Sequence, residues 1–348
     1  MDYPLTSNTQ QLKLINVAHV IEALKALNGA TKSAVAQATG LSVATCGTIL
    51  NGLCATGEVL QQALEESSGG RPAQRFVYNE HFFYVLSLFV ADVYSDHVIS
   101  YRVTSAGGNI VCAGKEPGAV ADTGGIIACI AEHAGRYNIQ AVGIGLPGVI
   151  VGGKVLTCDI PAFEGVALQR ILTDRFGLFT KVGNDMNYTA YGFYKNRGLG
   201  KDQPLAYLMF PEKHCPGCGI IVGGKALEGA TQFAGEVAHL PWHVGVGEVA
   251  ADGARYGGPA DGLARTVADI AISLISIINP GIIAITGARI GPETMATAAR
   301  LCQAAIPREH LPEIIYREGM EDDYLKGIAE MTLESANYQR LFGAAVSR

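Results

Sequence analysis

Four polar side chains stand in two pairs, and side chains of these types can form hydrogen bonds with hydroxyl groups. Asn184 and Asp185 are adjacent at the end of a strand-like run, and His239 follows Glu236 by three residues. Carboxylates and an amide accept or donate several hydrogen bonds to neighbouring hydroxyls, and an imidazole three residues after a carboxylate shares a local face with it. The alternative interpretation is structural: Asn184 and Asp185 cap a strand-to-helix junction, and His239 is a hydrogen-bonded core histidine.

The cysteines offer one further candidate site. Eight are scattered along the chain, mostly among apolar residues where a thiol behaves as a small buried hydrophobe, and we expect them to be reduced. The exception is Cys215-Pro-Gly-Cys218, preceded by His214, whose spacing is that of a redox or metal half-site. Because a tetrahedral structural site needs a second ligand pair, we predict neither a metal nor a cofactor there.

Composition limits the kinds of protein that this chain can be. A length of 348 residues predicts two or three structural units, and an apolar fraction of 49% predicts large cores. The net charge of −6 argues against binding a polyanion over the whole surface, so any contact with DNA must be local. The beginning of the chain has no basic and apolar signal pattern, and no long apolar run follows, so we expect a cytoplasmic protein without a membrane partner.

The first 80 residues carry the pattern of a winged helix-turn-helix. Apolar positions predict a helix over residues 12–27, a short helix over 31–39, and a third helix after Ser42 whose Ile49, Leu50 and Leu53 face inward. Two strand-like runs, 57–60 and 75–78, flank a loop rich in serine and glycine and predict a wing.

In such a domain the third helix enters the major groove of DNA and the wing reaches the minor groove. The expected DNA contacts are therefore the outward positions Ser42, Thr45, Thr48 and Asn51, together with Arg71 on the wing. Basic and acidic residues are nearly balanced over this segment, so a protein-interaction module stays an alternative. Taken singly, Ser42 is as well explained as a helix cap, and Arg71 as part of a turn with Pro72.

From Phe82 onward the pattern predicts two similar α/β lobes. Three apolar runs suggest a meander, and a helix, a strand ending in Gly-Leu-Pro-Gly, a second helix and a short strand into Asn184 follow. A similar order recurs, with strands near 205–210, 218–223 and 225–227, a helix over 261–278 and a strand over 281–286. Two such lobes imply a cleft between them, where small ligands bind.

These segments resemble the ROK family of sugar kinases and sugar-responsive repressors, and the winged-helix form resembles its repressors. The matching motifs, in order, are Gly145 to Gly148, Gly183-Asn184-Asp185-Met186-Asn187, Gly224-Lys225, Gly235-Glu236-Val237-Ala238-His239, and Asn279-Pro280 with Gly287. The resemblance implies that Asp185 matches the family's catalytic base, and that Asn184, Glu236 and His239 match sugar-binding positions. Asp159 stands where the family usually places a sugar-contacting asparagine.

The family's phosphate-binding features are degraded. A phosphate cradle needs glycines, because backbone N–H groups must converge on the oxyanion without side chains in the way. The first loop of the family, Asp-x-Gly-Gly-Thr-Lys, corresponds to residues 92–97, which read Asp-Val-Tyr-Ser-Asp-His. In the second loop, residues 213–219, only Gly217 and Gly219 persist, and the family's cysteine cluster after the histidine is absent. Positioning of ATP is the main contribution to phosphoryl transfer, so these losses argue against a kinase.

We therefore predict an actin/hexokinase-like ribonuclease H fold of α/β class in two lobes, preceded by a winged helix-turn-helix. The expected boundaries are 1–80, 81–185 and 186–330, with a C-terminal helix near 330–348 returning to the first lobe. The expected function is a non-enzymatic transcriptional regulator that binds a palindromic DNA operator as a homodimer or homotetramer and is controlled by a sugar or sugar phosphate. The rivals are a regulator controlled by a protein partner or another metabolite, and a residual sugar kinase.

Overall fold

The computed structural model describes residues 9–65, 73–93, 96–116, 120–212, 215–240 and 260–346. The first three helices are α1 (Thr9–Ala26), α2 (Lys32–Thr39) and α3 (Val43–Thr56). They pack with a three-stranded sheet in the order β1-β3-β2, made of Ala30–Thr31, Ala73–Tyr78 and Val59–Glu65. The predicted helix order and the antiparallel wing strands β2 and β3 are confirmed. The short β1, which pairs with β3, was not foreseen.

Local chemistry explains the tight turn between α2 and α3. Gly40 adopts a left-handed conformation with φ 71° and ends α2, where a residue with a side chain is strained. The hydroxyl of Ser42 accepts a hydrogen bond from the N–H of Thr45 and so begins α3. Ile49, Leu50 and Leu53 are buried in the core of this domain, as predicted.

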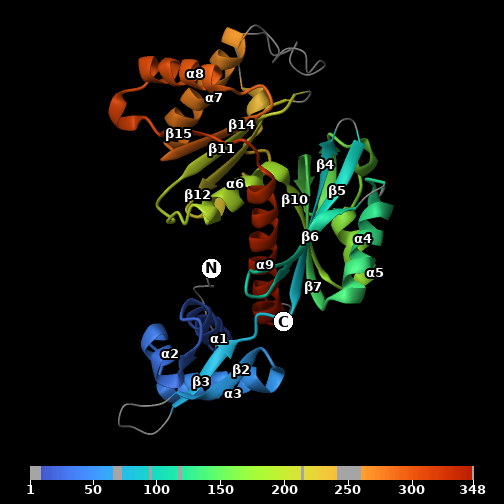
Figure 1. Cartoon of the computed structure of the whole chain (residues 1–348), viewed down its shortest axis with the longest axis vertical. Coiled ribbons are helices and arrows are strands. Elements are labelled where there is room, and N and C mark those ends of the chain that lie inside the picture. Colours follow the sequence, from blue (N-terminus) through green and yellow to red (C-terminus); the bar gives the residue numbers. More distant parts are fainter. Residues whose placement is uncertain are drawn as a thin grey trace.

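The first lobe is built on a five-stranded sheet in the order β10-β7-β4-β5-β6. Its strands are β4 (Tyr84–Val93), β5 (Asp96–Ser105), β6 (Ile110–Glu116), β7 (Ile139–Leu146) and β10 (Phe179–Asn184). The meander β4-β5-β6 is antiparallel, whereas β7 runs parallel to both β4 and β10. Helices α4 (Thr123–Arg136) and α5 (Leu168–Phe176) lie on one side of it (Figure 1). A hairpin of β8 (Gly148–Val151) and β9 (Lys154–Cys158) follows β7.

The second lobe repeats this plan with a sheet in the order β13-β12-β11-β14-β15. Its strands are β11 (Leu205–Phe210), β12 (Gly217–Val222), β13 (Lys225–Ala226), β14 (Ile282–Gly287) and β15 (Glu313–Tyr316). Helices α7 (Ala260–Ile278) and α8 (Pro292–Ala305) pack with β11, β12 and β14 in one apolar core. Helix α6 (Asp185–Asn196) leads into this lobe from β10 and packs against β11 and β12.

The long helix α9 (Glu321–Val346) connects all three parts of the molecule. It was expected near residues 330–348 and begins nine residues earlier, because residues 321–329 extend it along α6. It runs beside the first lobe's sheet and ends next to the N-terminal domain (Figure 1). In the first lobe, α9 packs against β4 and β7.

Helices α6 and α9 cross with backbone touching backbone. A Cβ atom added to Gly192 would lie 1.7 Å from the carbonyl oxygen of Asp323, and one added to Gly327 would lie 1.7 Å from that of Tyr188. Any side chain at either position would force the helices apart. The two glycines therefore set the position of α9 relative to α6. Over the described residues, no single helix has the length and apolar character needed to span a membrane.

Candidate functional site in the cleft between the lobes

Helix α6 begins at the candidate ligand residues. The side chain of Asn184 accepts a hydrogen bond from the N–H of Asn187 at 2.9 Å and donates one to the carbonyl of Gly148 at 3.0 Å. Asn184 therefore caps α6 and ties it to the β8–β9 hairpin, as the structural alternative proposed. Asp185 is the first residue of the helix and accepts a hydrogen bond from the N–H of Met186 at 2.8 Å.

The carboxyl group of Asp185 has unusual electrostatics. Burial raises its pKa to about 7, and the charges of Asp159 and Glu236 add to that rise, while the hydrogen bond from the N–H of Met186 opposes it. A carboxyl group with such a pKa is divided between its charged and neutral forms near neutral pH. It can accept hydrogen bonds in one form and donate one in the other, which suits a hydroxyl-bearing ligand.

The other predicted ligand residues influence one another's charge, as the pKa of Glu236 shows. Burial also raises the pKa of Glu236, with the Asp159 carboxylate adding to the rise and His239 opposing it. Asp159 follows β9, whereas Glu236 and His239 belong to the short helical turn that includes residues 237–239 of the second lobe. The structure thus brings Asp159, Asp185, Glu236 and His239 together from both lobes. His239 is exposed and packs beside the ring of Phe233, so its interpretation as a core histidine is wrong.

A cavity of 350 Å³ opens at Asn184, and sequence reasoning did not anticipate most of its lining. Its polar side chains include Lys181 and Asn184 on β10, Ser335 on α9, and Glu228 and Gln232 from the second lobe. The ammonium group of Lys181 donates to the hydroxyl of Ser335 at 3.2 Å, and burial lowers its pKa. Of the predicted ligand residues, only Asn184 lines this cavity.

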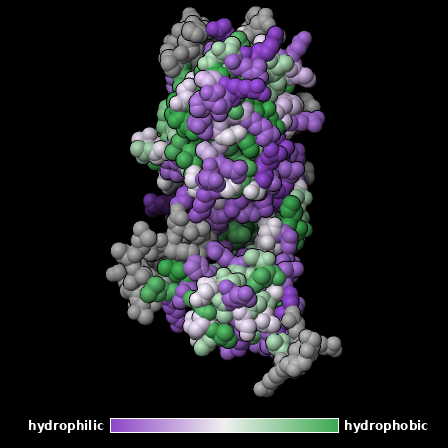
Figure 2. Space-filling model, turned by 90° about the vertical axis from the view of Figure 1, so that its left-hand side faces the viewer, coloured by the Kyte–Doolittle hydropathy of each residue, from purple (hydrophilic) through white to green (hydrophobic). Residues whose placement is uncertain are grey.

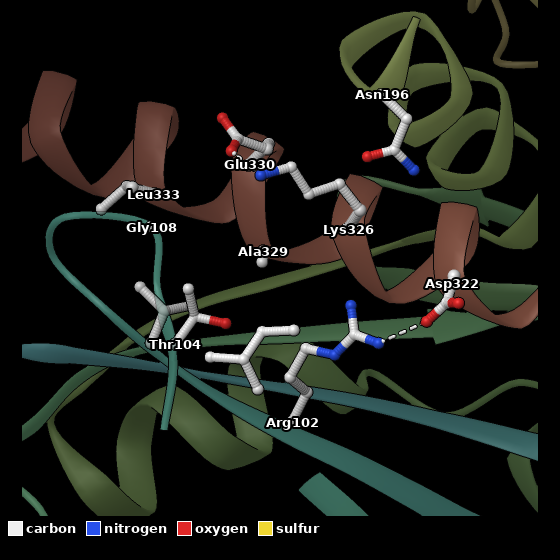
Figure 3. Close-up of a pocket in the computed structure, with 11 residues that line it drawn as sticks. Arg102, Thr104, Gly108, Asn196, Asp322, Lys326, Ala329, Glu330 and Leu333 are labelled. Atoms are coloured by element: carbon white, nitrogen blue, oxygen red, sulfur yellow. Dashed lines mark hydrogen bonds and ion pairs between the residues drawn. The ribbon is translucent and has the colours of Figure 1, made fainter. Parts of the chain in front are cut away.

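A second cavity, of 330 Å³, lies between the meander and α9 (Figure 3). Its charges are paired: Arg102 donates to Asp322 at 2.9 Å, and Lys326 lies 2.8 Å from Glu330. The pairing of Arg102 with Asp322 ties the beginning of α9 to β5, which gives these charges a structural role. None of the predicted ligand residues lines it.

The structure describes parts of the two segments that correspond to the family's phosphate-binding loops. Strands β4 and β5 pair as far as Val93 and Asp96, so two residues join them, and Tyr94 and Ser95 lie outside the described residues. Glycines 217 and 219 belong to β12 and face α6, where a Cβ at Gly219 would lie 2.0 Å from the carbonyl oxygen of Met186. Packing against α6 therefore explains why these two positions are glycine.

The cysteine pair of this loop is divided between two environments. Cys218 is buried in the core of the second lobe, whereas Cys215 is exposed. Lys213 and His214 lie outside the described residues. Among the described residues, no third histidine, cysteine or acidic side chain joins Cys215 and Cys218 in a group that could hold a metal.

The expected DNA-contacting face lies on α3. Ser42, Thr48 and Asn51 are exposed and Thr45 is half-buried, while Arg71 lies outside the described residues. The hydroxyl of Thr48 donates to the carbonyl of Ala44, and that of Ser42 serves as the helix cap. On the face that Figure 2 shows, the N-terminal domain is the lower body and its surface mixes hydrophilic and hydrophobic residues.

Fold and site together define a two-lobed α/β protein of the actin/hexokinase-like kind, preceded by a winged helix-turn-helix. Residues 123–255 match the ROK family, so the chain carries a ROK-family domain. A crystal structure of a ROK family transcriptional regulator, a homologue of the E. coli MLC protein, matches the whole fold with a TM-score of 0.73. The match covers 96% of this chain and 99% of that one, at 16% identity.

Curated relatives include both repressors and kinases. A protein of Caldicellulosiruptor sp. (strain Rt8B.4), described as a candidate xylose repressor, is 25% identical over 245 residues, which are 67% of this chain and 60% of that protein. The N-acetyl-D-glucosamine kinase of Aliivibrio fischeri is 32% identical over 117 residues, 33% of this chain and 38% of the kinase. The chain thus spans less than two thirds of either relative. The similarity to repressors supports the repressor branch of the family.

Proposed function

We propose that this chain is a DNA-binding transcriptional regulator whose inter-lobe cleft binds a sugar or sugar derivative, and that it transfers no phosphate. One observation carries the proposal: a winged helix is joined to the cleft by continuous packing. Asp185 begins α6, α6 crosses α9 at Gly192, and Arg340 near the end of α9 holds Glu58 of the winged helix through two hydrogen bonds of 2.7 and 2.6 Å. Ligand occupancy in the cleft thereby has a physical route to the DNA-binding domain.

DNA binding is assigned to the exposed face of α3. The side chains of Thr48 and Asn51 have the size and polarity to contact base edges and phosphates in the major groove. We further propose that two or four copies bind a palindromic operator, since paired winged helices match two half-sites. The acidic net charge of −6 confines the phosphate contacts to this domain.

The test of DNA binding uses operator fragments selected from random DNA by the full chain, measured by fluorescence anisotropy at several salt concentrations. Thr48→Ala is expected to weaken binding about ten-fold, since one lost contact costs about 1–3 kcal/mol. Thr266→Ala is the matched control, because Thr266 is also accessible on a helix and its hydroxyl likewise donates to a carbonyl four residues earlier. Equal affinity of the two variants, or no selected DNA at low salt, would refute this assignment.

Ligand binding in the cleft is tested by calorimetric titration with hexoses, N-acetylated amino sugars and their phosphates. Asp185→Asn is expected to lower the affinity of the bound sugar about 10- to 100-fold, because hydrogen bonds to a charged group contribute about 1.5–3 kcal/mol. Asp202→Asn, an exposed aspartate of the second lobe, serves as the control. Binding that Asp185→Asn leaves unchanged would place the ligand elsewhere and favour a regulator controlled by a protein partner or another metabolite.

One observation favours a residual sugar kinase as the second candidate. A pKa of about 7 at Asp185 is suited to a general base, and the N-acetyl-D-glucosamine kinase of Aliivibrio fischeri is a relative. ATP consumption with the same sugars is the discriminating assay. Turnover that Asp185→Asn abolishes would establish the kinase and overturn the non-enzymatic proposal.

A further inference from the structure

Three potential metal ligands converge in the first lobe, at the opposite edge of its sheet from β10 and the candidate ligand group. Cys129 and His133 lie one turn apart on the inner face of α4, and Glu116 ends β6. One donor atom from each of the three residues lies within 4.8 Å of the other two. In the part of the chain that the structure describes, no other group of three histidine, cysteine or acidic residues meets this condition.

The fold positions these side chains by regular periodicity. Gly114 and Glu116 lie two residues apart on the face of β6 that α4 covers, and the ring of Tyr101 on β5 fills the space over Gly114. Residues four apart on a helix share one face, so Cys129 and His133 point together toward this strand. Cys129 and His133 are 3% and 1% exposed, respectively. The Glu116 side chain is 20% exposed, which leaves a route for an ion from solvent.

The donor atoms are joined by long hydrogen bonds, and their separations also suit a shared cation. Nε2 of His133 lies 3.3 Å from Oε1 of Glu116, and Sγ of Cys129 lies 3.8 Å from the same oxygen. A good N–H···O hydrogen bond is shorter, about 2.9–3.0 Å. In a tetrahedral zinc site the ligand bonds of about 2.0–2.3 Å place nitrogen and oxygen about 3.4 Å apart, and sulfur and oxygen about 3.6 Å apart.

The imidazole of His133 faces Glu116 through Nε2. Nδ1 of His133 is buried and has no hydrogen-bond partner among the described residues. An unpaired buried polar atom costs about 1–3 kcal/mol, and binding of a metal through Nε2 leaves this cost unchanged. The ring of Tyr101 lies against that of His133 at 4.2 Å between centroids and fixes its orientation.

We propose that Glu116, Cys129 and His133 bind a divalent transition metal of the zinc class, with water as the fourth ligand. The charges balance, since a thiolate and a carboxylate offset a divalent cation and the neutral imidazole adds none, which is the condition for burying an ion. Mixed sulfur, nitrogen and oxygen donors favour zinc over magnesium or calcium. The metal clamps α4 to the edge strand β6. The Cys129 proton leaves to solvent when the ion binds.

The experiment is a cobalt titration of the full chain, stripped of metal with a chelator and kept reduced with a phosphine. Wild-type protein is expected to develop a near-ultraviolet thiolate-to-cobalt band and the visible bands of four-coordinate cobalt, saturating at one equivalent and reversed by zinc. Cys129→Ser is expected to lose the thiolate band. Glu116→Gln changes a partly exposed side chain and is expected to weaken cobalt binding at least ten-fold while leaving the fold intact by circular dichroism.

Two control variants make the outcome decisive. Cys302→Ser removes an equally buried thiol from the second lobe and is expected to retain the cobalt bands. Cys215→Ser removes the exposed cysteine of the Cys-x-x-Cys pair and is expected to retain them too. The proposal is overturned if wild-type protein shows no thiolate band, if the band persists in Cys129→Ser, or if Cys215→Ser abolishes it.

Discussion

Replacing Asp185 with asparagine tests the electrostatics of the cleft through stability, independently of any ligand. The substituted amide side chain keeps an oxygen that accepts the hydrogen bond from Met186 and removes the charge that burial disfavours. In the wild type the folded protein holds its proton at Asp185 up to a pKa of about 7, whereas the unfolded chain loses it near 3.8. Folding therefore binds more protons between these values, and the stability contributed by Asp185 falls as pH rises through this window.

The magnitude follows from the two pKa values. Each pKa unit corresponds to about 1.4 kcal/mol, so a rise from 3.8 to about 7 makes the charged Asp185 cost about 4 kcal/mol at pH 8. At pH 5 the folded protein keeps the proton and the cost is only about 2 kcal/mol. The asparagine variant lacks both costs. We expect the stability advantage of Asp185→Asn over the wild type to be about 2–3 kcal/mol larger at pH 8 than at pH 5.

The measurement is urea denaturation of the ligand-free chain at pH 5, 6.5 and 8, followed by circular dichroism, with both variants compared at each pH. Asp202→Asn, on an exposed turn of the second lobe, is the control and is expected to show no such pH-dependent gain. The reasoning is refuted if Asp185→Asn gains equally at pH 5 and pH 8, or if it is less stable than the wild type at pH 8.

Two further predictions concern the helices that surround the cleft. Gly192→Ala is expected to lose at least about 3 kcal/mol of stability, because its Cβ would meet the carbonyl oxygen of Asp323. Gly262→Ala, in a helix with open space around the glycine, is the control and is expected to be neutral or stabilising by up to about 1 kcal/mol. Urea denaturation compares the two variants, and equal stability would contradict the packing argument. Arg340→Ala is expected to cost about 3 kcal/mol of stability, because it removes the ion-pair partner of the Glu58 carboxylate, which is only 2% exposed. The N-terminal domain should then pack less tightly against α9. Limited proteolysis at the interdomain junction measures this loosening, and a cleavage rate equal to that of the wild type would contradict the prediction.

Sequence patterns predicted the N-terminal helices and the strands β7, β11 and β14, which are almost fully buried, but they missed helix α6. Helices α1 to α3 were indicated by the spacing of their apolar residues, and the meander by three runs of apolar residues. Helix α6 carries no such signal, because Met186, Tyr188 to Tyr194 and their neighbours are buried almost without interruption between the second sheet and α9. Only the cap at Asn184 indicated it. The beginning of α9 was missed because its first turns face α6, which a local pattern does not reveal.

Some residues of the candidate site were predicted from the sequence and others were not. Its carboxylates and His239 were found because residue types and order matched a known family, and their mutual charge effects are those expected of neighbours. Lys181 and Ser335 were not found, since they meet only through the packing of β10 against α9, about 150 residues apart in sequence. The spacing of Cys129 and His133, one helical turn apart, can be read from the sequence. The third residue of the proposed metal site, Glu116, comes from a different element and cannot be found in this way.

In the proposed regulator, helix α9 would link the cleft to the DNA-binding face. Its beginning is held to the first lobe by Arg102 through Asp322, and its end is held to the winged helix by Arg340 through Glu58. Because the backbones of α6 and α9 touch at the two glycines, no side chains lie between them there that could adjust to a movement of α6. A shift of α6 would therefore move α9 as a rigid rod. A ligand that favours one lobe arrangement by about 1–3 kcal/mol would change DNA affinity by about 5- to 150-fold through this rod. Because linkage is reciprocal, the proposed regulator would bind its cleft ligand with an affinity that operator DNA changes by the same factor.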